Sequence, residues 1–99
     1  MIAQIHGQVL ETRLDSLVVS IGGVGLSVMC SPDTIASAQV GKTIALHTSL
    51  VVREDSLTLF GFTSAQSREL FELIQSVSGF GPRLAFTIIS TMEPDALRE

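Results

Sequence analysis

Tryptophan and tyrosine are absent from this chain of 99 residues, and cysteine occurs once. The single cysteine, Cys30, excludes an internal disulfide and is typical of a reducing compartment; we interpret it as filling a strand face rather than acting as a nucleophile. Charged residues make up only 16% of the chain, against about 25% in a typical soluble domain. Because a chain this short buries only about 60–65% of its surface, we expect some apolar surface to meet another subunit or a further segment.

Long apolar runs and targeting signals are also lacking. The longest uncharged run, from Ser16 to Pro32, has 17 residues and three glycines, so it is too short and too interrupted for a membrane helix. No secretory signal opens the chain. We therefore expect a cytoplasmic protein with no membrane partner.

The net charge of −4 argues, taken alone, against nucleic acid as a ligand. The charge is unevenly distributed, however. Residues 1–53 carry three bases and three acids, whereas residues 54–99 carry seven acids and three arginines. The acidic excess therefore belongs to the second half of the chain and does not exclude a basic surface elsewhere.

The first two thirds of the chain predict an all-β domain. Strands are expected over residues 2–14 (bent or bulged at Gly7), 17–21, 24–30, 43–52 and 57–62, with a short helix capped by Ser31 before the fourth strand. Five short antiparallel strands with a helical piece between the third and fourth match the OB-fold, a five-stranded Greek-key β barrel. We therefore predict an OB-fold barrel over residues 1–63.

The hydrophobic period becomes helical after Phe62. A possible capping box at Thr63 opens a helix whose apolar stripe runs to Val77, and a second helix follows Pro82. A third helix is expected to start at Pro94. Residues 64–99 are thus predicted to hold one helix-hairpin-helix segment and the start of a further helix, so we expect a fragment of a longer protein.

The turn between those two helices has the residues of an anion site. Gly79 and Gly81 permit positive φ, and the free amides that begin the second helix can bind a phosphate. Arg83, the only charged residue between Glu72 and Glu93, adds a charged donor. The same residues are equally compatible with a plain corner between two helices.

Glu54 and Asp55 lie in the predicted turn between the fourth and fifth strands. A solvated hairpin tip is the simplest interpretation. Beside a phosphate-binding turn a second interpretation applies, because carboxylates repel phosphates. Two like charges about 4 Å apart repel by about 1 kcal/mol in water and about 4 kcal/mol near a protein surface. Acids at a chosen point would then shape or separate nucleic-acid strands.

Enzyme motifs are missing. Gly41-Lys42-Thr43 imitates the end of a P-loop, but the first glycine of that motif falls on Ala36 and a strand follows. His6 and His47 have no cysteine or carboxylate at metal-ligand spacing. We therefore predict no catalytic residue, no metal and no cofactor.

Five segments together resemble the RuvA family, the Holliday-junction-binding subunits of the bacterial RuvAB branch-migration complex. They are Met1-Ile2, Gly22-Gly23-Val24-Gly25, Val51-Val52-Arg53-Glu54-Asp55-Ser56, Leu59-Phe60-Gly61-Phe62 and Gly79-Phe80-Gly81-Pro82-Arg83-Leu84-Ala85. The resemblance covers essentially the whole chain. It implies an OB-fold, two helix-hairpin-helix motifs and a C-terminal domain that docks on the RuvB ATPase; only the first hairpin motif, roughly residues 66–91, lies in this chain.

The resemblance also assigns site residues. The acidic pin that separates DNA strands falls on Glu54 and Asp55, and the DNA-binding hairpin falls on Gly79, Phe80, Gly81 and Arg83. These roles imply a non-catalytic scaffold that binds four-way junctions by structure and not by sequence, in recombination and in DNA repair of the SOS response. The helicase activity of the complex would reside in RuvB.

The implied partners are four-way junction DNA, identical subunits in a tetramer or octamer, and the RuvB ATPase and RuvC resolvase of the full-length family. Residues 1–99 are not expected to contact RuvB, because the domain that does so is absent. The alternative is an oligomeric protein-assembly domain that does not itself bind DNA. A gel shift comparing a four-way junction with linear duplex distinguishes the two.

Overall fold

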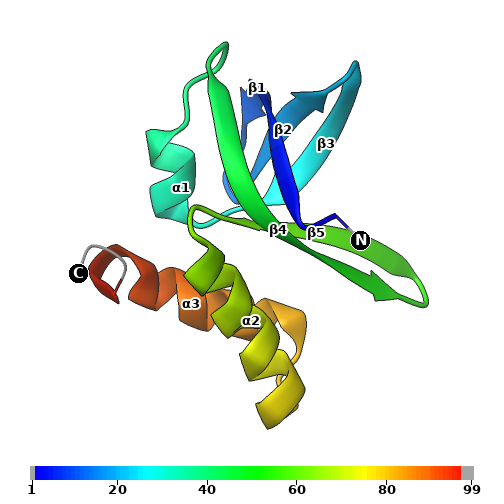
Figure 1. Cartoon of the computed structure of the whole chain (residues 1–99), viewed down its shortest axis with the longest axis vertical. Coiled ribbons are helices and arrows are strands. Elements are labelled where there is room, and N and C mark those ends of the chain that lie inside the picture. The colour runs from blue at the N-terminus through cyan, green and yellow to red at the C-terminus, as the bar shows by residue number, and fades with distance from the viewer. Residues whose placement is uncertain (1, 97–99) are drawn as a thin grey trace.

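A computed structural model describes residues 2–96, apart from the side chains of residue 78 and of residues 93–96. Within this range, five strands and one short helix make up a barrel region, and a pair of longer helices follows it (Figure 1). In chain order they are β1 (Gln4–Thr12), β2 (Ser16–Ile21), β3 (Val24–Met29), α1 (Pro32–Ser37), β4 (Thr43–Arg53), β5 (Ser56–Phe62), α2 (Ala65–Ser78) and α3 (Pro82–Ala96). None of the described helices is long and apolar enough to cross a membrane.

The strands close into a barrel in the order β1-β2-β3-β5-β4, which confirms the predicted five-stranded OB-fold. All pairs are antiparallel except β3 and β5, which run parallel through Val28–Leu59 and Met29–Phe60. The expectation of purely antiparallel strands was therefore wrong at this one pair. The parallel pair is possible because α1 and β4 separate β3 from β5 in the chain, and a crossover of that length can return the strand in the same direction.

The first strand departs from its prediction in the position of its irregularity. The register between β1 and β2 shifts between Val9 and Glu11, so the bulge lies at Leu10 and not at Gly7. Gly7 serves a different purpose: a Cβ on it would collide with the backbone carbonyl oxygen of Ser20 in β2. The glycine therefore permits the close approach of two backbones.

Two clusters of buried side chains form the core. The first fills the barrel and includes Leu17, Val28, Leu46 and Leu59. The second lies between the barrel and the helix pair and consists of Phe60, Phe62, Phe71, Ala85 and Ile89. Since successive residues of a strand face opposite sides, β5 contributes to both clusters.

Four phenylalanine rings, Phe60, Phe62, Phe71 and Phe86, make the contact between the barrel and the helices; we call them the aromatic cluster. The rings of Phe60 and Phe62 each lie between the ring of Phe71 on α2 and that of Phe86 on α3, with centroid distances of 4.9 to 5.9 Å and tilted planes. Such tilted pairs add about 0.5–1.5 kcal/mol each beyond the burial of their area.

The ends of the helices confirm one predicted cap and correct two other predictions. Ser31 caps α1 and Pro32 is its first residue, as expected. The cap of α2 is Ser64, whose Oγ accepts from the amide of Ser67 at 3.1 Å, and not Thr63; both residues suit a cap, and only the position of the first helical turn decides between them. α3 continues through Pro94 to Ala96, so no new helix starts at Pro94 within the described residues.

Proline removes one backbone donor and its ring crowds the carbonyl one turn earlier, so Pro94 is an unfavourable residue in the last turn of α3, and the helix nevertheless includes it. The rest of the third helix predicted from the sequence falls on residues 97–99 and lies outside the described residues.

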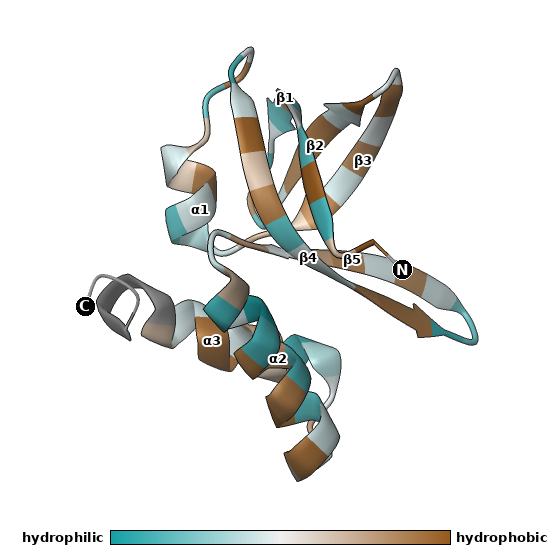
Figure 2. Cartoon of the chain, in the orientation of Figure 1, coloured by the Kyte–Doolittle hydropathy of each residue, from teal (hydrophilic) through white to brown (hydrophobic). Residues whose placement is uncertain are grey.

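Some hydrophobic side chains are left on the surface, as the composition predicts. Val52 and Leu57 on the β4–β5 hairpin, and Leu73 and Val77 on α2, are each more than half exposed. Hydrophobic bands accordingly reach the far end of α2 in Figure 2. The barrel and the helix pair therefore each retain apolar surface that the described residues do not cover.

Replacing Phe71 by alanine tests the aromatic cluster. Phe71 is fully buried, and we expect Phe71→Ala to lower the free energy of unfolding by about 3–5 kcal/mol, the usual cost of a buried phenylalanine. Leu73→Ala on the same helix is the control, because Leu73 is 54% exposed, and its loss should be under about 1 kcal/mol. Urea unfolding measures both; similar losses would contradict the role given to the rings.

Candidate nucleic-acid interface

The predicted acidic residues occupy the tip of a hairpin that projects from the barrel. Arg53 of β4 pairs with Ser56 of β5, so Glu54 and Asp55 alone make the turn; we call these two residues the acidic tip. β1 pairs with β4 only as far as His47, and β3 pairs with β5 only at Leu59 and Phe60. Residues 51–53 of β4 and residues 56–58 of β5 pair only with each other, and Figure 1 shows the hairpin extending away from the barrel.

The acidic tip carries two carboxylates into solvent, since both residues are exposed. Among the described residues a single ion pair forms, between Arg13 and Glu11 at 2.8 Å. The charges of the tip are therefore not neutralised within the described part of the chain. They are available to repel any other anion that approaches the hairpin.

The second predicted element, the glycine hairpin (residues 79–81), joins α2 to α3. Gly79 ends α2 with φ of 73°, in the left-handed region that favours glycine. Gly81 does not have a positive φ, although the sequence allowed one. Its carbonyl oxygen accepts from the amide of Ala85 at 3.1 Å and so begins α3, with Pro82 as the first helical residue.

The backbone of the glycine hairpin is open to a ligand. A Cβ added to Gly79 or to Gly81 would meet no heavy atom within 4 Å. The first amides of a helix have no acceptor within the helix itself, and at the start of α3 these are the amides of Arg83 and Leu84. Exposed amides at a helix N-terminus form a site for an anion.

A groove brings the hairpin of the acidic tip and the glycine hairpin together. Its volume is about 280 Å³ and it is lined from the strands by Val51, Arg53, Ser56, Thr58 and Phe60, and from the helices by Gly81, Pro82, Arg83 and Leu84. We call it the hairpin groove. Two arginines thirty residues apart in the chain, Arg53 and Arg83, therefore line one concave surface beside the hydroxyl groups of Ser56 and Thr58.

Arg53 was not among the site residues predicted from the sequence. The signal was available in the strand pattern. Residues 56, 58 and 60 share one face of β5, and Arg53 and Val51 lie opposite Ser56 and Thr58 on β4. Once Phe60 is known to face the helices, Arg53 must face them as well.

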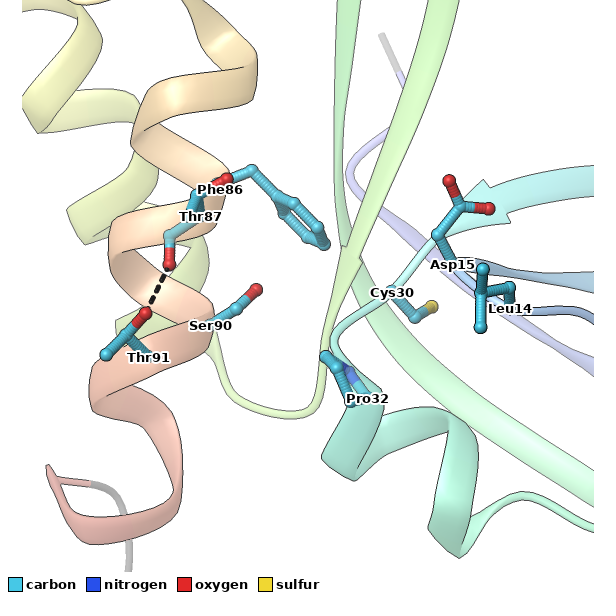
Figure 3. Close-up of a pocket in the computed structure, with 8 residues that line it drawn as sticks. All are labelled: Leu14, Asp15, Cys30, Pro32, Phe86, Thr87, Ser90 and Thr91. Carbon is cyan, nitrogen blue, oxygen red and sulfur yellow. Dashed lines mark hydrogen bonds between the residues drawn. The ribbon is translucent and has the colours of Figure 1, made fainter.

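A second hollow lies elsewhere, between the barrel and α3, with a volume of about 430 Å³ (Figure 3). Its lining includes Cys30, Asp15 and Ser90, and it shares no residue with the hairpin groove. The Oγ of Ser90 is buried in it without a hydrogen-bond partner, whereas the hydroxyls of Thr87 and Thr91 donate to carbonyls one turn earlier. The lining holds no histidine or lysine, and its one carboxylate is that of Asp15.

Metal-ligating side chains do not gather into a cluster in the described part of the chain. No group of three histidine, cysteine, aspartate or glutamate residues that could hold a metal ion is found there. His6 and His47 lie on neighbouring strands, β1 and β4, but do not pair with each other.

Comparison with known proteins gives one consistent family. Residues 1–61 match the family model described as the RuvA N terminal domain. Over 98 residues the chain is 54% identical to a protein from Beutenbergia cavernae, 51% to one from Nocardioides and 50% to one from Streptomyces coelicolor. Each is named as the Holliday junction branch migration complex subunit RuvA.

These matches include both parts of the candidate interface. They cover 99% of this chain and 49% of each relative, so the chain spans about half the length of the curated relatives it matches. The acidic tip lies within the residues matched by the family model, and the glycine hairpin lies beyond them but within the stretch aligned to the relatives.

The two glycines of the hairpin should respond differently to alanine. Gly79→Ala places a Cβ at φ of 73°, which costs about 1–2 kcal/mol. Gly81→Ala has open space and no positive φ, so its free energy of unfolding should stay within about 0.5 kcal/mol of the wild type. Thermal unfolding of both variants measures this, and a larger loss in Gly81→Ala than in Gly79→Ala would contradict the backbone described.

Proposed function

Because the chain belongs to the RuvA N-terminal domain family, we propose that it binds four-way DNA junctions as a non-catalytic scaffold for branch migration. The observation that carries this proposal is the hairpin groove, which is lined by Arg53, the residue before the acidic tip, and by Arg83, two residues beyond the open backbone of the glycine hairpin. Cations and anions placed side by side can attract one part of a DNA structure and repel another.

In this proposal the glycine hairpin and the two arginines hold the duplex arms by their phosphates. Backbone amides, together with arginine side chains, suit phosphate oxygens. Contacts to phosphates carry no information about base sequence. Binding through them would therefore be independent of sequence, which is what a scaffold needs if the junction is to move along the DNA.

The acidic tip would act at the crossover. Since Glu54 and Asp55 project beyond the barrel on a narrow hairpin, they can reach between strands that the rest of the surface cannot enter. We propose that their charges keep phosphates away from the centre and separate the exchanging strands. In a tetramer, four subunits would supply 4 × 2 = 8 such carboxylates around one axis.

The remaining partners follow from the family and are part of the same proposal. ATP hydrolysis and helicase activity would belong to RuvB, docked on a part of the longer protein outside residues 1–99, and RuvC would act on the same junction. The protein would work in the cytoplasm, where DNA is repaired and recombined. No cofactor is required for the role proposed.

The exposed hydrophobic residues favour a second candidate, a protein-assembly domain without DNA binding. Val52, Leu57, Leu73 and Val77 are exposed and could pack against other subunits. A gel shift comparing a four-way junction with linear duplex of equal length, at several salt concentrations, decides between the two. Preferential, salt-sensitive binding of the junction supports the scaffold, and absence of any binding supports assembly alone.

Neutralising the acidic tip should weaken discrimination between DNA structures. In Glu54→Gln with Asp55→Asn, we expect linear duplex to bind about fivefold more tightly, because removing a repulsion of about 1 kcal/mol raises the binding constant by that factor. The ratio of junction affinity to duplex affinity should fall accordingly. Fluorescence anisotropy with both DNAs measures the two constants.

Asp15→Asn with Asp33→Asn is the matched control, since it removes the same charge from exposed carboxylates that, like those of the tip, form no ion pair within the described residues. It should leave the ratio of affinities unchanged. Equal effects of the two double variants would mean that net charge, and not the position of the acids, governs discrimination, and the proposed role of the tip would be wrong.

Removing the arginines of the groove should weaken binding without changing sequence preference. Arg83→Ala and Arg53→Ala should each lower the slope of log affinity against log salt by about one unit, and the double variant by about two. Arg13→Ala, which lies outside the groove and is paired with Glu11, should change the slope less. Losses that depend on DNA sequence would contradict contacts to phosphate.

A further inference from the structure

Two side chains of α2, Arg68 and Glu72, connect the helix to the barrel by hydrogen bonds. Nη1 of Arg68 donates to the carbonyl oxygen of Ala3 at 2.8 Å. Oε2 of Glu72 accepts from the buried hydroxyl of Ser49 on β4 at 2.9 Å. Residues four apart lie on the same face of a helix, so the two bonds together define one line of attachment, which we call the polar bracket.

The barrel end of the polar bracket is itself firmly held. The amide of Thr48 donates to the carbonyl oxygen of Ala3 at 2.9 Å, and its hydroxyl donates to that of Ile2 at 2.8 Å. The oxygen that Arg68 contacts is therefore already fixed to β4, and Thr48 is buried. Arg68 thus joins α2 to a rigid point of the barrel.

The polar bracket can fix the tilt of α2 relative to the barrel, which the aromatic cluster does not do. Packing of apolar surface is non-directional, so the phenylalanine rings hold the helices against β5 without defining a single tilt. On the side of the bracket a hollow of about 280 Å³ remains, lined in part by Leu50, Arg68 and Glu72. Because α2 is not closely packed there, the two hydrogen bonds bridge a gap, and without them the tilt of α2 could change.

A small tilt of α2 has a large effect at the glycine hairpin. Gly79 is eleven residues beyond Arg68, which is about 16 Å along a helix axis. Rotation of the helix by about 10° at Arg68 would thus move the hairpin by roughly 3 Å. That displacement is close to the rise of about 3.4 Å between successive phosphates of one DNA strand.

We propose that Arg68 and Glu72 are positioning residues that fix the tilt of α2, and with it the distance between the glycine hairpin and the acidic tip. This inference rests on the proposed function in one respect: the distance matters for choosing a junction over a duplex. The two residues touch no DNA in this scheme. They act by placing the hairpin so that duplex arms are held at a set distance from the crossover.

The geometric part can be tested without DNA. Spin labels on Leu57→Cys and Val77→Cys report the distance between the β4–β5 hairpin and the far end of α2; both positions are exposed, whereas Cys30 is buried and should stay unlabelled. Ser49→Ala with Arg68→Met removes both bonds. We expect the mean distance to shift by about 2 Å or the distribution to broaden by that amount, and an unchanged distribution would overturn the proposal.

Single substitutions distinguish an effect on the position of α2 from effects of lost charge or lost stability. Ser49→Ala alone alters no charge and should broaden the distribution partly. Glu72→Gln keeps an oxygen that can accept from Ser49, so it should retain the wild-type distance distribution. Glu72→Ala has no such acceptor and should broaden the distribution. Equal behaviour of Glu72→Gln and Glu72→Ala would contradict the bracket, and melting temperatures identify any variant that merely fails to fold.

The DNA part is tested by the ratio of junction affinity to duplex affinity. We expect this ratio to fall at least fivefold in Ser49→Ala with Arg68→Met, while Arg13→Met, the matched loss of an arginine, leaves it unchanged. A shifted label distance with an unaltered ratio would overturn the link to selectivity. If the wild type has no junction preference, the proposed function fails, and the label distances still decide whether the bracket sets the tilt.

Discussion

The packing of four phenylalanine rings between β5 and the two long helices is the contact on which the rest of this structure depends. Phe60 and Phe62 present one face of β5 to the helices, while Leu59 on the opposite face fills the barrel. One strand therefore links both parts of the core. In a chain without tryptophan or tyrosine, phenylalanine supplies all the aromatic area for this contact, with no polar atom to satisfy.

The same strand also positions charged residues of the candidate interface. β5 is one strand of the hairpin that carries the acidic tip, so the rings hold the helices against the same strand that leads to Glu54 and Asp55. Arg53 and Arg83 both line the hairpin groove. An acidic protein can thus present a local cationic surface, because charges within about 10 Å of each other matter more than the net charge in physiological salt.

Much of the fold could be predicted from local patterns. Alternation of apolar residues and turn residues located all five strands, and helical spacing located α2 and the start of α3. The predictions were wrong where two neighbouring residues suit the same role, or where pairing with a distant strand determines the local backbone. Ser64 and Thr63 can both cap a helix, and the bulge at Leu10 instead of Gly7 depends on how β1 pairs with β2.

By itself, the sequence determined the chemistry of each part: a glycine-rich corner that can bind an anion, two acids in a turn, and a barrel of five strands. The local conformation of each part depends mainly on residues that are close in the chain, so the sequence pattern alone indicates it. Only the tertiary structure decided that Arg53 lies with Arg83, that β3 runs parallel to β5, and that Arg68 reaches the carbonyl of Ala3. These contacts join residues 30 to 65 positions apart, and their partners are chosen by packing, because no local pattern specifies which distant surface a side chain will meet.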